Sequence, residues 1–372
     1  MIVGVLGGGQ LGRMLALAGY PLGLRFRFFD PVEDACVDDL APRVRAAYDD
    51  LDAIARFADG LDVVTYEFEN VDVETARFLE ERGTRVLPPV RALEVSQDRL
   101  IEKEFLQAQG IETAPFRAVD SEEELRHAVE ALGLPAVLKA RRFGYDGRGQ
   151  VVLREAVDVA QACVAFDGTP AIVEGFVPFT RELSIIAVRR GDGGFACYPL
   201  VENRHHEGIL RVSRAPATVS DTLQQAAENA VRRVQEALDY VGVLTIEWFE
   251  CEGRLIANEI APRVHNSGHW TIEGADTSQF ENHLRAITRL PLGSTRARGA
   301  SAMVNLIGSV PSLGAMAAAP GVHVHLYGKA ARPGRKLGHV TLCADDEDGL
   351  SARLPGFMRS LIGPGNDTIQ GQ

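Results

Sequence analysis

Two glutamates and an asparagine stand where they could hold a divalent cation. Glu247 lies in the run LTIEWFE, and Asn258 and Glu259 lie in the run LIANEIAPR. Both runs are rich in apolar residues, so we expect adjacent strands in which an uncompensated carboxylate would be costly. Carboxylate and amide oxygens, completed by phosphate oxygens, suit Mg2+. The pattern predicts Glu247 and Glu259 as metal ligands with Asn258 beside them, the alternative being an acidic pair on a surface hairpin.

A lysine and a glycine-rich loop supply the opposite charge. Lys139 lies on the apolar run PAVLKARR, directly before the loop GYDGRGQ. A lysine of this kind can neutralise a phosphate while loop amides cradle its oxygens. The spacing is not that of a Walker motif, so it is a different solution to the same problem. The residues of the loop are Gly144, Tyr145, Asp146, Gly147, Arg148, Gly149 and Gln150.

Two further glutamates mark a connection between strands. Glu174 ends one predicted strand and Glu182 starts the next, in IVEGFVPFTRELSI. Such a connection can offer backbone groups to adenine and a carboxylate to ribose hydroxyls. Taken singly, each glutamate also fits a solvated strand end.

A compact group of donors follows Glu259. Arg263, His265 and Asn266 supply a forked cation, an imidazole and an amide within four residues, enough to hold a planar carboxylate-like anion. Asp146, in the glycine loop, is a candidate general base.

The first residues carry a dinucleotide fingerprint. Gly7, Gly9 and Gly12 follow a predicted strand and open a helix, and Asp30 ends the next strand. This spacing fits nicotinamide or flavin binding, but a glycine turn after a first strand also suits other anion-binding α/β domains.

Alternating strands and helices predict a doubly wound parallel sheet over about the first 95 residues. The strands are expected at 2–9, 25–31 and 62–69, with helices at 10–23 and 71–83. A helix at 96–111 leads into an α+β unit, in which a helix at 121–133 begins at an N-cap serine. Further strands are expected at 181–190, 193–206, 208–217, 243–253 and 254–263, and the last 70 residues are expected to be strand-rich with a polar tail.

Together, the lysine strand, the glycine loop, the 174–177 connection and the group Glu247, Asn258 and Glu259 resemble the ATP-grasp superfamily. Within it, GGGQLGRML, FGYDGRGQ, NEIAPRVHNSGHWT and RPGRKLGH resemble the 5-(carboxyamino)imidazole ribonucleotide synthase family, and the resemblance runs from residue 2 to about 343. It implies an ATP-grasp fold of mixed α/β and α+β structure. We expect a Rossmann-like N-terminal domain at 1–98, a lid at 99–178 and a strand-rich body at 179–372.

The resemblance also implies a reaction of ATP, bicarbonate and aminoimidazole ribonucleotide in purine biosynthesis, with Mg2+ (alternatively Mn2+) as cofactor. It places Arg99 and Lys139 at the ATP phosphates, Glu174, Gly175, Phe176 and Val177 at adenine, Glu182 at ribose, and His205 near the nucleotide, with the adjacent His206 as the alternative. Tyr145, Asp146 and Arg148 would face the aminoimidazole nucleotide, Gln10 would border it, and Lys329 and Arg335 would hold its phosphate.

Composition limits the partners. A formal net charge of -12 argues against a general nucleic-acid binder, and the five cysteines are scattered singly, which favours a reducing cytoplasm. The longest segment without charged side chains contains prolines and glycines, so no membrane span is expected. The resemblance implies a homodimer.

Three other functions remain open at this point. The front glycines alone would fit an NAD-dependent oxidoreductase. A different ATP-grasp ligase or carboxylase, such as a formate-using transformylase or a biotin carboxylase, would share Lys139 and the acidic pair. A noncatalytic protein that kept the fold is the third.

Overall fold

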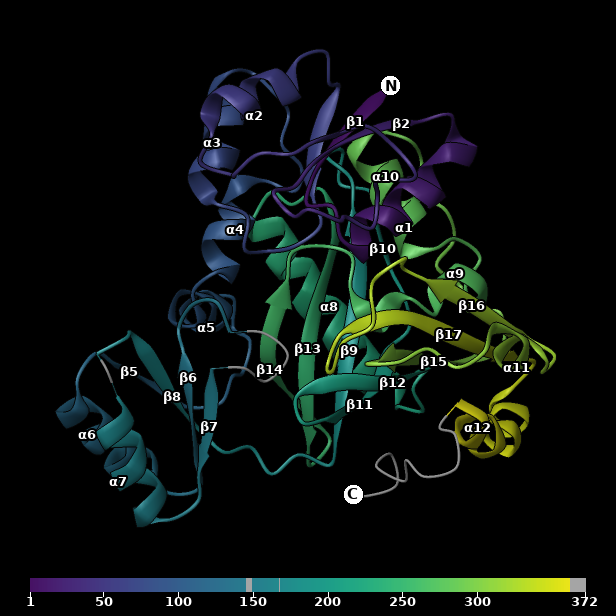
Figure 1. Cartoon of the computed structure of the whole chain (residues 1–372). Coiled ribbons are helices and arrows are strands. Elements are labelled where there is room, and N and C mark those ends of the chain that lie inside the picture. The colour runs from purple at the N-terminus through teal and green to yellow at the C-terminus, as the bar shows by residue number, and fades with distance from the viewer. Residues whose placement is uncertain (145–148, 167, 362–372) are drawn as a thin grey trace.

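The computed structural model describes residues 1–144, 149–166 and 168–361. Its strands form three sheets, each with helices packed beside it. In Figure 1 the N-terminal unit lies at the top, the large sheet at the centre and right, and a small sheet projects at the lower left. We call these the N-terminal unit, the body and the lid. No helix in the described ranges combines the length and the apolar character needed to cross a membrane.

The N-terminal unit is a parallel sheet of four strands in the order β3-β2-β1-β4, which confirms the predicted parallel arrangement. The predicted helix at 10–23 ends at Gly19 and continues as a 3-10 turn, in which Pro21 has no amide to donate to the preceding helical turn. The sequence analysis did not predict the strand β3 or the helices α2 and α4. The elements are β1 (Ile2–Leu6), α1 (Gln10–Gly19), η1 (Tyr20–Leu22), β2 (Arg25–Phe29), β3 (Arg43–Val44), α2 (Leu51–Ala58), β4 (Val63–Tyr66), α3 (Val73–Glu81) and α4 (Val90–Ser96).

The lid is an antiparallel sheet in the order β5-β8-β6-β7 with two helices packed on it. The predicted cap of α6 is confirmed, because the Ser121 side chain accepts a hydrogen bond from the Glu124 amide. The elements are α5 (Arg99–Ala108), which leads in from the N-terminal unit, then β5 (Phe116–Val119), α6 (Glu122–Leu132), β6 (Ala136–Ala140), β7 (Gln150–Leu153), α7 (Ala156–Ala165) and β8 (Ala171–Gly175).

The body is a nine-stranded antiparallel sheet in the order β14-β13-β9-β11-β12-β15-β17-β16, with β10 paired to β9. The single strand predicted at 193–206 is wrong, because Pro199 lies between two shorter strands and cannot donate to a ladder. Part of the expected tail is helical, as α12. The elements are β9 (Arg181–Arg189), β10 (Phe195–Cys197), β11 (Val201–His206), β12 (Ile209–Ala215), α8 (Asp221–Ala237), β13 (Gly242–Cys251), β14 (Arg254–Ala261), η2 (Asn266–Gly268), α9 (Thr271–Gly274), α10 (Gln279–Ile287), β15 (Ala300–Ile307), α11 (Leu313–Ala317), β16 (Val322–Leu326), β17 (Lys336–Ala344) and α12 (Glu347–Leu361).

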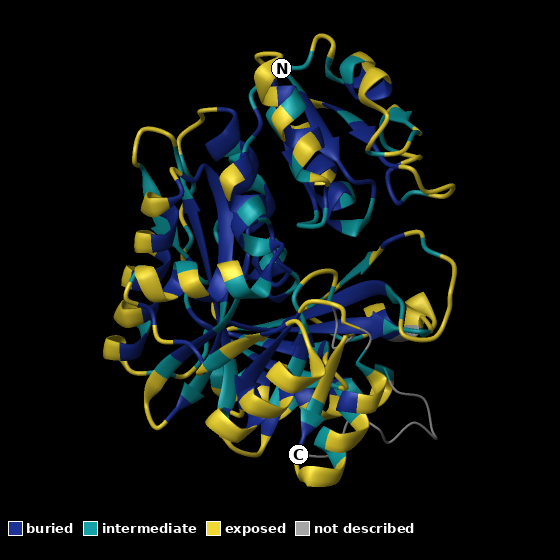
Figure 2. Ribbon diagram, turned by 90° about the vertical axis from the view of Figure 1, so that its left-hand side faces the viewer, coloured by how far each residue is buried: buried dark blue, intermediate teal, exposed yellow. Residues whose placement is uncertain are grey.

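One apolar core joins the N-terminal unit to the body. Leu15 of α1 and Leu284 of α10 belong to the same buried cluster, and both are fully buried. The fit is close, since a Cβ added at Gly19 would come within 3.0 Å of Leu284 Cδ1. Figure 2 shows buried strands in the N-terminal unit and the body, and helices whose outer faces are exposed. The two units therefore bury their apolar surfaces against each other.

We expect Leu284→Ala to lower the free energy of unfolding by about 2–5 kcal/mol, because it leaves a cavity between the two units. Denaturant unfolding followed by circular dichroism measures the loss. Leu290→Ala, at a side chain that is 38% exposed, is the matched control and should change it by less than about 0.5 kcal/mol. Equal effects of the two substitutions would show that the shared core is not a major source of stability.

Candidate active site

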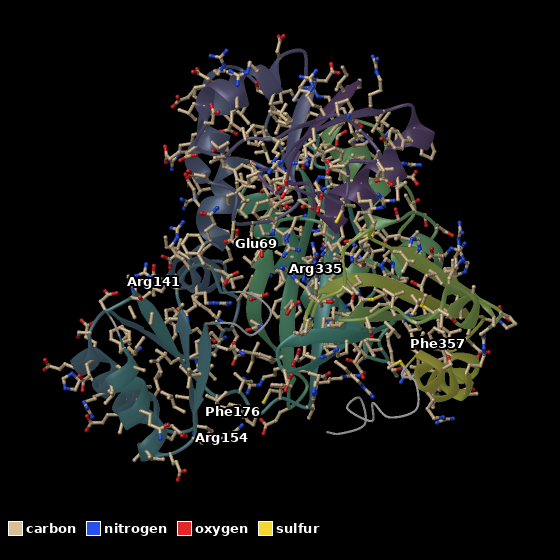
Figure 3. All side chains as sticks on the ribbon, viewed as in Figure 1. Glu69, Arg141, Arg154, Phe176, Arg335 and Phe357 are labelled. Carbon is tan, nitrogen blue, oxygen red and sulfur yellow. The ribbon has the colours of Figure 1, made fainter. Side chains whose placement is uncertain are left out.

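A cleft of about 740 Å³ lies where the N-terminal unit, the lid and the body meet. Figure 3 shows Glu69 beneath the N-terminal unit, with Arg141 and Phe176 on the side of the lid. Most of the predicted site residues line this cleft, although they come from all three units. They are Gln10, Arg99, Lys139, Gly144, Gln150, Glu174, Gly175, Phe176, Val177, Glu182, His205, Glu247, Asn258, Glu259, Arg263, His265 and Asn266.

Of the other predicted residues, Gly149, Lys329 and Arg335 are not among those that line the cleft. Gly149 closes the base of the loop, with its carbonyl accepting from the Ala140 amide at 2.8 Å. Lys329 donates to the side chain of Gln10, and Arg335 donates to the Ala330 carbonyl at 3.1 Å. Tyr145, Asp146, Gly147 and Arg148 lie outside the described residues, so their assigned contacts stay predictions.

Glu174 is the anion between two buried lysines. Its Oε2 lies 3.0 Å from Lys139 Nζ and 3.4 Å from Lys103 Nζ. Burial alone would raise the pKa of Glu174, but the charges of the two lysines lower it to about 2. The pKa of Lys139 is lowered by burial and by the second lysine, with Glu174 opposing both. The cluster carries one cation more than it has anions, which suits the binding of a phosphate.

The sequence analysis did not predict Lys103 as a site residue, although the structure shows that it is fully buried beside Glu174. Besides Glu174, its ammonium group donates to the Asn258 carbonyl at 2.9 Å and to the Ala257 carbonyl at 3.4 Å. It thus ties α5 to β14 of the body, although the predicted boundary assigns α5 to the lid. The sequence did contain a signal for Lys103. Positions 99 and 103 are four apart, so a helix places Lys103 on the same face as the predicted phosphate-binding Arg99.

Glu247 and Glu259 stand opposite each other on β13 and β14. The register shifts between Glu247 and Trp248, so that Asn258 is an extra residue on β14. Consecutive residues of a regular strand point to opposite faces, but this bulge lets both Asn258 and Glu259 line the cleft. Arg99 Nη1 lies 3.2 Å from Glu259 Oε2.

The acidic side of the cleft fits a divalent cation. Burial, and then the charge of Glu259, raise the pKa of Glu247 to about 7. The Asn258 Oδ1 atom is buried without a hydrogen-bond partner. Among the described residues no group of three or more His, Cys, Asp or Glu side chains suits a metal. A cation held here would therefore draw its remaining ligands from phosphate oxygens or water, as Mg2+ commonly does.

The predicted anion-binding donors are already partly engaged. The Nε and Nη2 groups of Arg263 form a fork with Glu69 of the N-terminal unit, with Nη2 at 3.0 Å from Oε1. Asn266 exchanges two amide hydrogen bonds with Asn305, at 3.0 and 2.7 Å. His265 Nε2 lies 3.2 Å from Glu247 Oε1. Arg263 Nη1 also donates to the Val264 carbonyl at 3.1 Å, so the N–H groups left for an anion are one on each Nη atom of Arg263 and one on Asn266.

His205 contacts the carboxylate of Glu182. Burial lowers its pKa, but Glu182 and then Glu247 outweigh that effect and raise it. Of the two adjacent histidines, His205 lines the cleft and His206 does not.

The glycine turn that resembled a dinucleotide site is filled by the protein itself. The Gly8 amide donates to Asp30 Oδ2 at 2.6 Å, the Gly12 amide donates to Glu67 Oε2 at 2.6 Å, and the Gly9 amide donates to Glu67 Oε1. Burial raises the pKa of Glu67, while the Gly12 and Gly9 amides lower it. The backbone donors that would receive a pyrophosphate are thus taken, which removes the basis for the NAD-dependent alternative.

The geometry defines an ATP-grasp enzyme, in which a lid lysine and a pair of body carboxylates face one cleft. The comparisons agree. Residues 104–280 match the ATP-grasp domain family, residues 1–97 the ribonucleotide synthetase preATP-grasp domain, and residues 301–353 the phosphoribosylaminoimidazole carboxylase C-terminal domain. The predicted fold class is confirmed.

Full-length relatives narrow the class. N5-carboxyaminoimidazole ribonucleotide synthase of Pseudomonas aeruginosa is 53% identical, over 95% of this chain and 98% of its own length. The crystal structure of N5-carboxyaminoimidazole ribonucleotide synthetase from Thermus thermophilus is 55% identical, with a TM-score of 0.93 over 98% and 99% of the two chains. An Aspergillus clavatus enzyme in complex with ADP and 5-aminoimidazole ribonucleotide is 34% identical, with a TM-score of 0.88 over 96% and 98%. The chain belongs to the N5-carboxyaminoimidazole ribonucleotide synthase family.

A third carboxyl group, that of Glu102, is buried on α5 and predicts a pH dependence. It accepts from the Ile260 amide at 2.5 Å, and burial and then the charge of Glu259 raise its pKa to about 8. The folded state then binds a proton that the unfolded state releases near pH 4.5, so stability is lost as pH rises from about 4.5 to 8. Glu102→Gln keeps the acceptor but has no such proton, so the variant should match the parent at pH 5.

At pH 8 we expect Glu102→Gln to be more stable than the parent by on the order of 2–4 kcal/mol. Urea unfolding of the metal-free protein at both pH values measures this difference. Glu104→Gln, at an exposed carboxylate of the same helix, is the control and should show no such change. A difference that is the same at pH 5 and pH 8 would contradict the assignment.

Proposed function

We propose that the chain is an ATP-dependent ligase that N-carboxylates 5-aminoimidazole ribonucleotide with bicarbonate, giving ADP, phosphate and 5-(carboxyamino)imidazole ribonucleotide. The observation that carries the proposal is the placing of opposite charges in one cleft. Lys139, with Glu174 as its counter-ion, lies on one side, and Glu247 and Glu259 lie on the other. The bound ligands named for the Aspergillus clavatus relative are those that this reaction would consume and release.

In this proposal Arg99 and Lys139 bind the phosphates of ATP, residues 174–177 hold adenine, and Glu182 binds ribose beside His205. Glu247 and Glu259 would hold Mg2+, with Mn2+ as the alternative and Asn258 adjacent. The bound cation would neutralise charge on the phosphates. Glu174 holds the ammonium group of Lys139, and Lys103 holds Glu174 and the backbone carbonyl of Asn258, so both residues would fix the groups that bind ATP and the cation.

Bicarbonate is a poor electrophile, so it needs a leaving group. Transfer of the terminal phosphoryl group of ATP to a bicarbonate oxygen gives carboxyphosphate and ADP. Arg263, His265 and Asn266 would hold the anion near that phosphate, since they follow Glu259 closely on the chain. Attack by the amine of the ribonucleotide then forms the carbon–nitrogen bond, releases phosphate and requires loss of an amine proton, for which Asp146 is the proposed base.

The ribonucleotide would lie against the N-terminal unit. Lys329 contacts Gln10, and both Lys329 and Arg335 are near enough to Cys36 to lower the pKa of its thiol, against the larger effect of burial. Cys36 in turn donates its amide to the Gly8 carbonyl of the glycine turn. These two cations therefore gather beside that turn, where they would bind the nucleotide phosphate, with Tyr145 and Arg148 completing the site.

The chain would act in the cytoplasm as a homodimer, with small molecules as its ligands and without binding nucleic acid or membranes. The acidic net charge of -12 supports the exclusion of nucleic acid.

Phosphate release from ATP tests the proposed function. We expect rapid release only when 5-aminoimidazole ribonucleotide and bicarbonate are both present with Mg2+. Release that depends on formate instead would favour a transformylase. In a parallel melting experiment, ATP with Mg2+ should raise the melting temperature and NAD should not. A rate of ATP hydrolysis that does not depend on bicarbonate or on 5-aminoimidazole ribonucleotide would refute the proposed reaction.

We expect Glu259→Gln to fold like the parent but to lose turnover by at least about a hundredfold, because it removes a proposed metal carboxylate. Thermal melting and the phosphate assay measure the two properties. Glu252→Gln, in the exposed turn of the same hairpin, is the control and should retain parental turnover. Parental turnover in Glu259→Gln would show that the metal assignment is wrong.

A further inference from the structure

A chain of buried hydrogen bonds leads from the cleft into the body sheet. His265 Nδ1 lies 2.8 Å from Ser267 Oγ, which lies 2.7 Å from Ser184 Oγ. Asn203 Nδ2 donates to Ser184 Oγ at 3.0 Å, and Ser213 Oγ donates to Asn203 Oδ1 at 2.7 Å. All five side chains are buried, and among them His265 alone lines the cleft.

The direction of this chain follows from one backbone group. The Ser267 amide points at His265 Nδ1 at 3.3 Å, with the histidine side chain capping the short helix η2. A backbone N–H can only donate, so Nδ1 accepts and the ring proton belongs on Nε2. Ser267 Oγ then donates to Nδ1 and accepts from Ser184.

The other hydrogen bonds of this series donate in the same direction. With its own proton given to Ser267, Ser184 Oγ accepts from the Asn203 amide nitrogen, which has no lone pair to offer. The Asn203 oxygen is left to accept from Ser213. From Ser213 to His265 each member except the last therefore donates toward the cleft, and no bond has to be reversed to accommodate another.

We propose that Ser267 and Ser184 are positioning residues that hold His265 in the Nε2–H tautomer, so that His265 acts in the cleft as a hydrogen-bond donor and not as a proton acceptor. This rests on the proposed function for its catalytic consequence. The Nε2–H group faces Glu247 Oε1 at 3.2 Å and can donate to an oxygen of bicarbonate or carboxyphosphate. With the Nδ1 lone pair taken by Ser267, the base that receives the amine proton must be another group.

A merely structural role would make a different prediction. Buried polar groups need partners in any case, and a packed histidine satisfied in either tautomer would serve that need. The present arrangement favours one tautomer and presents its N–H to the reacting groups. The tautomer is therefore the property to measure.

NMR of the full chain with 15N-labelled histidine measures it, with the His265 signals assigned by their loss in His265→Gln. We expect Nδ1 to be unprotonated and Nε2 to be protonated in the parent. Ser267→Ala and Ser184→Ala should each shift the ring nitrogens toward a mixture of tautomers. Ser301→Ala removes an equally buried hydroxyl that is not part of this series of hydrogen bonds, and it should leave the His265 ring signals unchanged. A protonated Nδ1 in the parent, or unchanged signals in both serine variants, would overturn the proposal.

Kinetics separate a donor from a base. Glutamine offers an N–H near the position of Nε2 but cannot take up a proton, whereas leucine offers neither. We expect His265→Gln to keep turnover within about tenfold of the parent and His265→Leu to lose roughly a hundredfold or more, with the KM for ATP little changed in both. Ser184→Ala, which touches neither substrate, should lower kcat by about five- to tenfold. Equal losses in the glutamine and leucine variants would overturn the donor role.

The two measurements also separate this inference from the proposed reaction. If the parent shows no turnover that depends on bicarbonate and the ribonucleotide, the proposed function fails, while the NMR result still decides the tautomer. If turnover is as proposed and the tautomer is not, the positioning role alone is refuted. Thermal melting of each variant confirms that it is folded, and Ser184→Ala reports on the chain should Ser267→Ala fail to fold.

Discussion

Three ion pairs in the cleft join parts of the chain that are distant in sequence. Glu174 of the lid holds Lys103 of α5, Glu69 of the N-terminal unit holds Arg263 of the body, and Arg99 holds Glu259. A buried charge without a partner would be costly, so these pairs exist only when the units are assembled. The site and the arrangement of the three sheets therefore depend on each other. Because the cationic cluster at Glu174 carries a surplus cation, it is also ready for an anionic ligand.

Much of this could be predicted from the sequence, and the misses have physical causes. Lys139, the glycine loop and the carboxylates of β13 and β14 are found by residue type and by their apolar neighbours. The bulge beside Glu247 could not be found, because a shift of register depends on the partner strand. The partners of Arg263 and Asn266 were missed for a similar reason, since Glu69 and Asn305 are distant in sequence.

The glycine turn of the N-terminal unit shows how a motif can keep its backbone and lose its usual ligand. Gly7, Gly9 and Gly12 form the close turn that the fingerprint predicts. Glu67, from the end of β4, occupies the amides at Gly9 and Gly12, and a Cβ at Gly9 would come within 2.4 Å of its carboxylate oxygen. Glycine is needed there for close approach by a side chain of the same chain. Residue spacing alone cannot tell an internal carboxylate from an external phosphate.

The core shared by α1 and α10 sets an order of events during synthesis on the ribosome. More than 250 residues separate the end of α1 from the start of α10. At roughly 5–20 residues per second, α10 is made on the order of 10–50 s after α1. During that interval the part of α1 that packs on α10 has no permanent cover, although the parallel sheet that packs on the rest of its apolar face is already complete in sequence. The first unit to leave the ribosome must therefore wait for one of the later helices, and this delay is when a nascent chain is most exposed to chaperones and to aggregation.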